Sequence, residues 1–186
     1  LHSFPTRRSS DLVRSYQNNQ WQGGPIINGQ LVESVQRVAV TSPQHTNHQV
    51  GTIGWADAAL AEEALAVANK AFPEWSRTDV NVRAEALETL ADKLEENIVE
   101  LIALCTMEAG KTLQDGIDEV REAVDFCRYY AIEARKLMGQ GQDMPGPTGE
   151  TNKWSVQGRG TFVCISPWNF PLAIFLGQVT AALATG

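Results

Sequence analysis

One segment near the end of the chain constrains the fold more than any other, because an uncharged run there meets two prolines and then an apolar stretch. The run TFVCIS, residues 161–166, is rich in β-branched and aromatic types and predicts a strand buried on both faces of a parallel sheet. Pro167 and Pro171 interrupt the strand and suit the first turn of a following helix. Ligands of α/β sheets bind at the carboxyl ends of strands, so Trp168 and Asn169 are expected beside a cleft.

The middle of the chain predicts helices. Apolar residues recur at helical spacing over residues 56–72, and Pro73 is expected to stop this first helix. A second helix is predicted to begin near Asp79, a good N-cap residue, and to end at Gly110. A third covers residues 113–138. Amphipathic helices normally bury their apolar face, so we expect all three apolar stripes to lie in the core.

Four motifs occur in order along the chain. They are AFPEW (71–75), MEAGKTLQDGIDEVREAVDFCRYYAIEAR (107–135), PGPTGETN (145–152) and GRGTFVCISPWNFPLAIFLGQVTAALATG (158–186), the last of which contains the PWNFP turn. Together they resemble the aldehyde dehydrogenase superfamily, and more narrowly the L-glutamate γ-semialdehyde dehydrogenase module of the bacterial bifunctional proline utilization A family. The resemblance covers roughly residues 21–186.

This resemblance implies an α/β fold class: the N-terminal part of an aldehyde dehydrogenase fold, with helices and the start of a Rossmann-like parallel sheet, truncated at Gly186. Residues 13–43, polar and glycine-containing, are expected to form an entry arm. Residues 44–186 would be the N-terminal part of the NAD-binding domain. Within them, residues 151–160 would form a strand of a hairpin used in oligomer contacts.

The first dozen residues, LHSFPTRRSSDL, do not match the family and lack the apolar core of a signal peptide. They resemble translated sequencing-adapter read-through, and the alternative is a native polar lead-in. Under either interpretation we expect no chemistry from residues 1–12.

The resemblance also implies a reaction, the NAD-dependent oxidation of L-glutamate γ-semialdehyde to L-glutamate in proline degradation. In this family a cysteine thiolate attacks the aldehyde, hydride passes to the nicotinamide ring, and a glutamate activates water. Both the cysteine and the glutamate are expected beyond Gly186, so the chain alone should be inactive. Asn169 matches the side chain that donates to the oxyanion, a role for which an uncharged amide on a rigid turn is suited.

Other positions match the family's binding residues. The end of the predicted strand would line the cofactor cleft around the nicotinamide ribose, Phe170 would form an aromatic wall of the aldehyde tunnel, and Glu122 would face the amino-acid end of the substrate. The expected cofactor-binding residues are Ile165, Ser166, Pro167 and Trp168. FAD is expected only in a proline dehydrogenase domain upstream of this chain, if one exists.

Partners and compartment follow partly from composition. The net charge of −7, from 15 basic and 22 acidic residues, argues against nucleic-acid binding. Three cysteines without a C-x-x-C pair indicate a reducing cytoplasm. The resemblance implies a homodimer when intact, an aldehyde substrate, and peripheral membrane association of the bifunctional parent.

Several other patterns do not support a site. Gly110-Lys111-Thr112 has the ending of a P-loop, but Cys105 replaces its first glycine and the preceding residues predict a helix rather than a strand. His45 and His48 lie in a polar loop without a third ligand at metal spacing, so no metal site is expected. Two alternatives stay open: an aldehyde dehydrogenase with a different substrate, and a non-catalytic helical interaction module.

Overall fold

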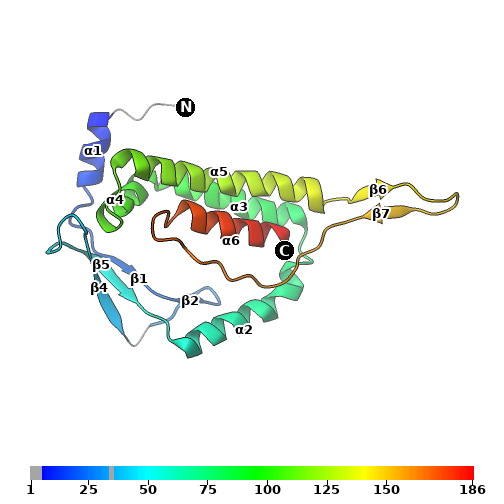
Figure 1. Cartoon of the computed structure of the whole chain (residues 1–186), viewed down its shortest axis with the longest axis horizontal. Helices are drawn as coiled ribbons and strands as arrows, with labels where there is room; N and C mark the ends of the chain where they lie inside the picture. The colour runs from blue at the N-terminus through cyan, green and yellow to red at the C-terminus, as the bar shows by residue number, and fades with distance from the viewer. Residues whose placement is uncertain (1–5, 34–35) are drawn as a thin grey trace.

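A computed structural model describes residues 6–33 and 36–186 and shows a layer of helices beside a small sheet (Figure 1). The helices are α1 (Thr6–Arg14), α2 (Ala58–Trp75), α3 (Val80–Glu96), α4 (Ile98–Glu108), α5 (Leu113–Met138) and α6 (Ala173–Thr185). The strands are β1 (Trp21–Gly23), β2 (Ile26–Ile27), β3 (Gln30–Leu31), β4 (Arg37–Thr41), β5 (Gln49–Gly54), β6 (Gln142–Met144) and β7 (Asn152–Trp154).

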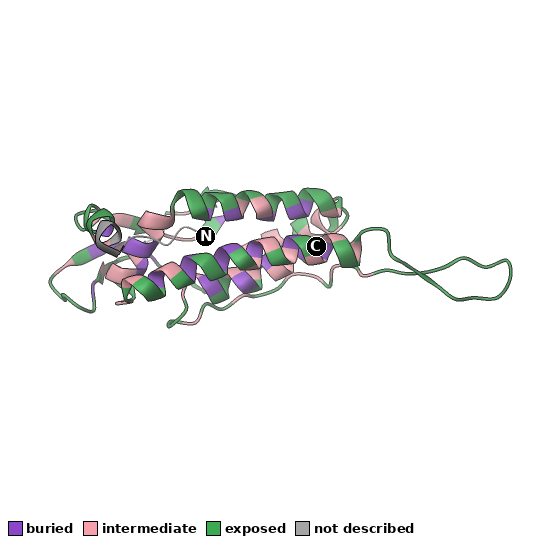
Figure 2. Cartoon of the chain, turned by 90° about the horizontal axis from the view of Figure 1, so that it is seen from above, coloured by how far each residue is buried: buried purple, intermediate pink, exposed green. Residues whose placement is uncertain are grey.

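The core lies where α3, α4 and α6 pack against the long helix α5. The stripe predicted for residues 113–138 is confirmed, since Val120, Val124 and Cys127 are all buried. Buried residues of these helices lie on the sides that meet (Figure 2). A small residue permits the close approach of α5 and α6, because a Cβ at Gly177 would lie 3.1 Å from the ring of Phe126.

The small sheet has the strand order β1-β5-β4, with β1 parallel and β4 antiparallel to β5. The predicted entry arm ends at residue 43, between β4 and β5, so the pairing of these two strands joins the arm to the segment that follows it. A short hairpin joins β2 to β3 through Asn28 and Gly29, which both have positive φ as a type I′ turn requires. The division of the chain at residues 13–43 and 44–186 stays a prediction.

Of the predicted non-native tail 1–12, residues 1–5 lie outside the described residues, and residue 6 begins α1. Helix α1 packs against α4. Val13, near its end, is buried with Ile102 and Val120. Whether residues 1–12 are native stays a prediction.

Three expectations about the helices are wrong. Pro73 lies inside α2, which continues to Trp75 because the amide of Ser76 still donates to Phe72 O at 2.8 Å. The helix predicted for residues 79–110 is divided into α3 and α4 at Asn97, whose side-chain amide donates to Lys93 O at 2.8 Å and ends α3.

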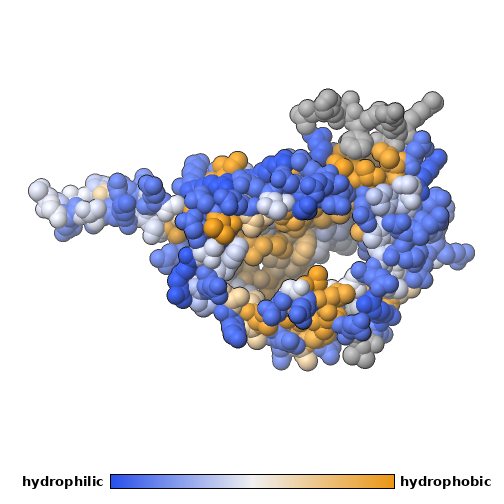
Figure 3. Space-filling view, turned by 180° about the vertical axis from the view of Figure 1, so that it is seen from behind, coloured by the Kyte–Doolittle hydropathy of each residue, from blue (hydrophilic) through white to orange (hydrophobic). Residues whose placement is uncertain are grey.

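The third correction concerns burial, because the apolar stripe of α2 does not lie in the core. No residue of this helix is buried, and Leu65 is exposed. Helix α2 lies apart from the α3–α5–α6 layer along most of its length (Figure 1), and its contacts are mainly with β2. That layer therefore does not cover its apolar face. On the side of the molecule opposite to that in Figure 1, apolar side chains gather around a hollow (Figure 3).

The buried strand predicted at residues 161–166 is also wrong. The segment runs irregularly along α6, and Phe162, Val163 and Ile165 are exposed. A strand needs hydrogen-bonded neighbours on its edges. In the part of the chain that the structure describes, no strand pairs with this segment.

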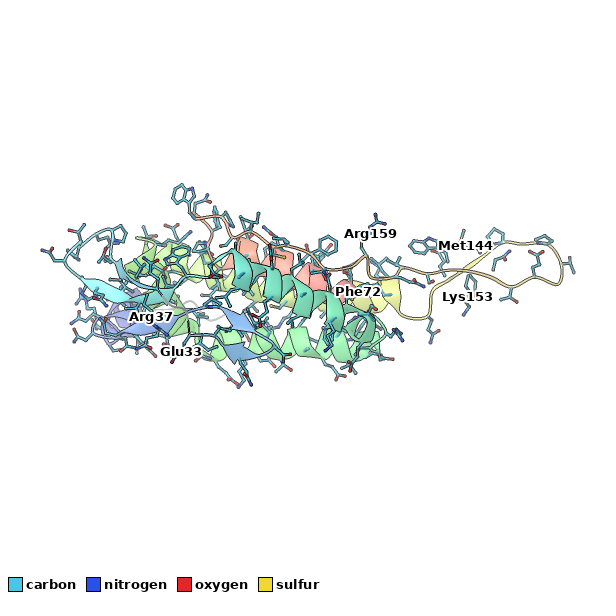
Figure 4. The ribbon with its side chains drawn as sticks, turned by 90° about the horizontal axis from the view of Figure 1, so that it is seen from below. Glu33, Arg37, Phe72, Met144, Lys153 and Arg159 are labelled. Atoms are coloured by element: carbon cyan, nitrogen blue, oxygen red, sulfur yellow. The ribbon has the colours of Figure 1, made fainter. Side chains whose placement is uncertain are left out.

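The exposed strand expected within residues 151–160 does form, as β7, and it pairs antiparallel with β6. The β6–β7 hairpin projects away from the rest of the molecule (Figure 1). Met144 and Lys153 lie on its two arms in Figure 4, and Lys153 Nζ is 3.9 Å from the carboxylate of Asp143. All six paired residues are exposed, so the hairpin contributes little to the core.

Candidate active site

The candidate site is the turn between the irregular segment 161–167 and helix α6. Pro167 and Pro171 lie outside the helix, which begins at Ala173. The turn is closed on itself, because Ser166 Oγ donates to Pro171 O at 3.2 Å. Asn169 lies in the middle of this turn and is exposed, so its side-chain amide is accessible to a ligand.

A cleft of about 450 Å³ lies between this turn and the C-terminal part of α4. The cleft is mainly apolar, with Leu101, Leu104 and Cys105 on the α4 side. Three of the four expected cofactor-binding residues line it from the turn: Ser166, Pro167 and Trp168. The fourth, Ile165, does not line this cleft and is 75% exposed.

The start of α6 is held by a residue that the sequence analysis missed. Glu119 of α5 is 1% exposed, and its Oε2 accepts the amides of Leu172 at 3.3 Å and Ala173 at 2.9 Å. The first amides of a helix have no partner within the helix and carry a partial positive charge. A carboxylate therefore caps this helix end, whose N-cap residue, Leu172, makes no side-chain hydrogen bond.

Lys111 neutralises that buried carboxylate. Its Nζ lies 2.8 Å from Glu119 Oε1 and 4.4 Å from the centre of the Phe170 ring, and the side chain is 13% exposed. An ammonium group over an aromatic face is attracted by the ring electrons. The cation thus contacts both the cap of α6 and the residue that follows Asn169.

A signal for Glu119 was present in the sequence. Its neighbours one turn away on α5, Gly116 and Ala123, are small and buried, so a charged residue stands on the core face of the helix. Such a charge is rarely buried unless it is paired. Lys111 was considered only within the rejected P-loop pattern, and helix α4 does precede it, as expected.

The predicted substrate residues lie differently from one another. Phe170 is 39% exposed and contacts Lys111, whereas Glu122 is exposed on α5, almost one turn beyond Glu119. The carboxylate that reaches the turn is thus Glu119. The roles of Glu122 and Phe170 in substrate binding stay predictions.

The cysteines are placed as small apolar residues. Cys105 and Cys127 are buried, as expected, whereas Cys164, expected in a buried strand, is half-buried. Burial and then the charge of Glu119 raise the pKa of Cys105 to about 11, and burial also raises the pKa of Cys127. Thiols with raised pKa values are poor nucleophiles at neutral pH.

No group of three or more metal-binding side chains occurs within residues 6–33 and 36–186. Across the same residues, no helix combines the length and the apolar character that crossing a membrane requires.

The fold described above agrees with comparisons to known proteins. The chain belongs to the aldehyde dehydrogenase family, whose model matches residues 31–186. It is 39% identical over 177 residues to the bifunctional protein PutA of Salmonella typhimurium, a match that covers 95% of this chain and 12% of that protein. It is 37% identical over 161 residues to the 1-pyrroline-5-carboxylate dehydrogenase of a Geobacillus species, a match that covers 87% of this chain and 31% of the relative.

Solved structures agree with this assignment. PutA from Bdellovibrio bacteriovorus matches with a TM-score of 0.91 at 30% identity, over 96% of this chain and 19% of that one. A mutant form of Thermus thermophilus 1-pyrroline-5-carboxylate dehydrogenase matches with a TM-score of 0.90 at 29% identity, over 100% of this chain and 39% of that one. The expected fold class, the N-terminal part of an aldehyde dehydrogenase fold, is confirmed. The chain spans less than half the length of each of these relatives.

Proposed function

We propose that the whole protein carrying this chain catalyses the NAD-dependent oxidation of L-glutamate γ-semialdehyde to L-glutamate. One observation of the structure supports this most directly: Asn169 is exposed on a closed turn beside a cleft. Relatives named 1-pyrroline-5-carboxylate dehydrogenase and PutA support the choice of substrate. The 186-residue chain alone is expected to show no turnover.

Asn169 would act on the charge that develops during attack on the aldehyde. When a nucleophile adds to the carbonyl carbon, the carbonyl oxygen gains negative charge, and an N–H donor placed beforehand stabilises it. The side-chain amide of Asn169 is such a donor. The carboxylate of Glu119 and the hydroxyl of Ser166 fix the turn that carries it, so little reorganisation is needed as the charge forms.

The cleft has features that suit a nicotinamide coenzyme. Its walls combine apolar helix residues with the hydroxyl of Ser166, the ring of Pro167 and the indole of Trp168, which is 89% exposed. These residues, with Ile165, would hold the coenzyme, and NAD would supply the hydride acceptor. The preference for NAD over NADP is part of the proposal.

The test is substitution of Asn169 in the whole protein. Asn169→Ala should lower kcat by about 10² to 10³-fold, which is typical for loss of one oxyanion donor. NADH formation is followed with L-glutamate γ-semialdehyde and with a panel of other aldehydes. Asn69→Ala, on the exposed surface of α2, is the matched control. An unchanged kcat in Asn169→Ala would show that Asn169 is not an oxyanion donor. Faster turnover of another aldehyde would show that L-glutamate γ-semialdehyde is not the preferred substrate.

The proposal extends to assembly and location. The β6–β7 hairpin projects from the molecule and exposes Trp154, which supports a role in a homodimer. Light scattering of the whole protein with Trp154→Glu tests this, and an unchanged dimer would exclude the residue from the interface.

A cytoplasmic location is proposed from the free thiols of the described residues, and cell fractionation tests it.

A further inference from the structure

A buried ion pair lies directly beneath the turn that carries Asn169. Oε2 of Glu119 accepts the amides of Leu172 and Ala173, and Lys111 Nζ lies 2.8 Å from Oε1 of the same carboxylate. The pair therefore connects α5 to the start of α6, although Glu119 and Leu172 are 53 positions apart in the sequence. A buried carboxylate with this geometry fixes where α6 begins.

The backbone before Lys111 fixes the position of its side chain. Gly110 has a φ of +68°, a conformation that favours glycine, and it turns the chain out of α4. A Cβ at this position would also lie 3.0 Å from Pro43 Cγ. After the turn, the amide of Lys111 donates to Cys105 O at 3.3 Å. Lys111 is thus tied at its backbone and directed toward Glu119 and Phe170.

The other end of the turn is held by a side chain of α6. The side-chain amide of Gln178 accepts a hydrogen bond from Ile165 N at 3.1 Å through Oε1 and donates one to Ile165 O at 3.2 Å through Nε2. Between the two anchors, Trp168 and Asn169 are exposed and receive little support from packing. The orientation of the Asn169 amide therefore depends on the anchors at Ile165 and at Leu172.

We propose that Lys111 and Glu119 are positioning residues that hold Asn169 in place for aldehyde oxidation. The inference rests on the proposed function and adds two residues to it. Lys111 contributes twice, since it forms an ion pair with the buried carboxylate of Glu119 and also contacts Phe170, the residue adjacent to Asn169. Neither side chain is required to touch the substrate.

A role in stability alone makes a different prediction from a positioning role. Removing Lys111 leaves an unpaired buried carboxylate, which destabilises the protein, and removing both charges relieves that penalty. The double variant K111M/E119Q should therefore recover thermal stability relative to Lys111→Met under either role. Under the positioning role it should not recover kcat, because the contact with Phe170 and the charged cap of α6 are both absent.

The experiment uses the whole protein with Lys111→Met, Glu119→Gln and the double variant. We expect kcat to fall about tenfold to a hundredfold in all three, as for a displaced catalytic group, while KM for the aldehyde changes less than about twofold. Matched controls are Lys136→Met and Asp118→Asn, both exposed on α5. If Lys111→Met does not fold, Glu119→Gln and the double variant carry the same comparison. Recovery of kcat together with the melting temperature in the double variant overturns the inference.

A second measurement does not depend on activity. Hydrogen exchange of the amides of Leu172 and Ala173 should become faster in Lys111→Met and stay unchanged in Lys136→Met. Unchanged exchange in Lys111→Met overturns the inference whatever the activity. Inactivity of the unsubstituted protein toward aldehydes, with exchange changed as expected, instead overturns the proposed function.

Discussion

At the residue scale, a few buried charges determine how the helices meet. Arg83 is 4% exposed, and its guanidinium donates to three backbone carbonyls, those of Ala184 at 3.2 Å, Ser76 at 3.5 Å and Thr78. Burial lowers the pKa of Arg83, although a guanidinium stays charged at neutral pH. These hydrogen bonds connect the end of α6 to the α2–α3 connection.

Arg83→Met should lower the free energy of unfolding by about 2 to 3 kcal/mol, because the buried carbonyls lose charged donors and gain none. Urea unfolding measures the change. Arg77→Met, at a neighbouring exposed position, serves as the control and should stay within about 0.5 kcal/mol of the parent. Equal effects of the two substitutions would show that the contacts of Arg83 do not contribute to stability.

The thiol of Cys105 should make stability depend on pH. Its pKa of about 11 in the folded protein lies above the ordinary value of 9.0, so the folded form keeps a proton that the unfolded form releases. The contribution of this thiol to the free energy of unfolding is therefore constant below about pH 9 and falls as the pH rises toward 11. The parent should lose about 2 to 3 kcal/mol more than Cys105→Ala over this range. Urea unfolding of both proteins checks this, and parallel pH profiles would contradict it.

The sequence located the turn of the candidate site but not the residues that hold it, for a physical reason. Asn169 was selected as a candidate because two prolines and a helix start define its turn locally, and its role stays a prediction. Glu119 and Lys111 were missed because their importance depends on contacts with Leu172 and Phe170, which are distant in sequence. Local pattern gives the type of residue on a helix face, but only the packing of α5 on α6 gives its partner.

At the element scale, the long helix α5 was predicted in full because its apolar stripe packs on several neighbours. The division at Asn97 was missed, since the stripe continues through it and the interruption depends on one side-chain hydrogen bond. The burial of α2 was wrong for the opposite reason. Its stripe is as regular as the others, but a regular apolar face is buried only where another element covers it.

This difference between α5 and α2 leads to a prediction about their caps. Thr112 Oγ1 accepts the amide of Asp115 at 3.1 Å at the start of α5, and Asp57 accepts the amide of Leu60 at 2.9 Å at the start of α2. Thr112→Ala should lower the global free energy of unfolding by about 1 kcal/mol, because α5 carries the core. Asp57→Ala should leave it nearly unchanged and speed amide exchange within α2 alone.

Urea unfolding and hydrogen exchange of both variants test the prediction. Thr112→Ser keeps the hydroxyl and should retain most of the stability. A global loss in Asp57→Ala equal to that in Thr112→Ala would show that α2 unfolds together with the α3–α5–α6 layer.

At the scale of the whole molecule, the segment at residues 161–166 has the composition of a buried strand without the neighbours of one. At Ile165 a side chain partly replaces a neighbouring strand, because the side-chain amide of Gln178 hydrogen-bonds to both the backbone N–H and the carbonyl of Ile165. Sequence composition predicted what this segment can become when other strands pair with it. Composition alone could not show that no strand among the described residues pairs with this segment.

The exposed apolar side chains of this segment should make the 186-residue chain self-associate. Val163 is 77% exposed and Phe162 is 57% exposed on one continuous stretch, and such stretches pair readily with other copies. Val163→Lys should reduce the concentration-dependent rise in scattered light without lowering the melting temperature, because the side chain is outside the core. Val82→Lys, on the surface of α3, introduces the same charge away from the segment and should leave association unchanged. Equal reductions in both variants would assign the effect to net charge rather than to this surface.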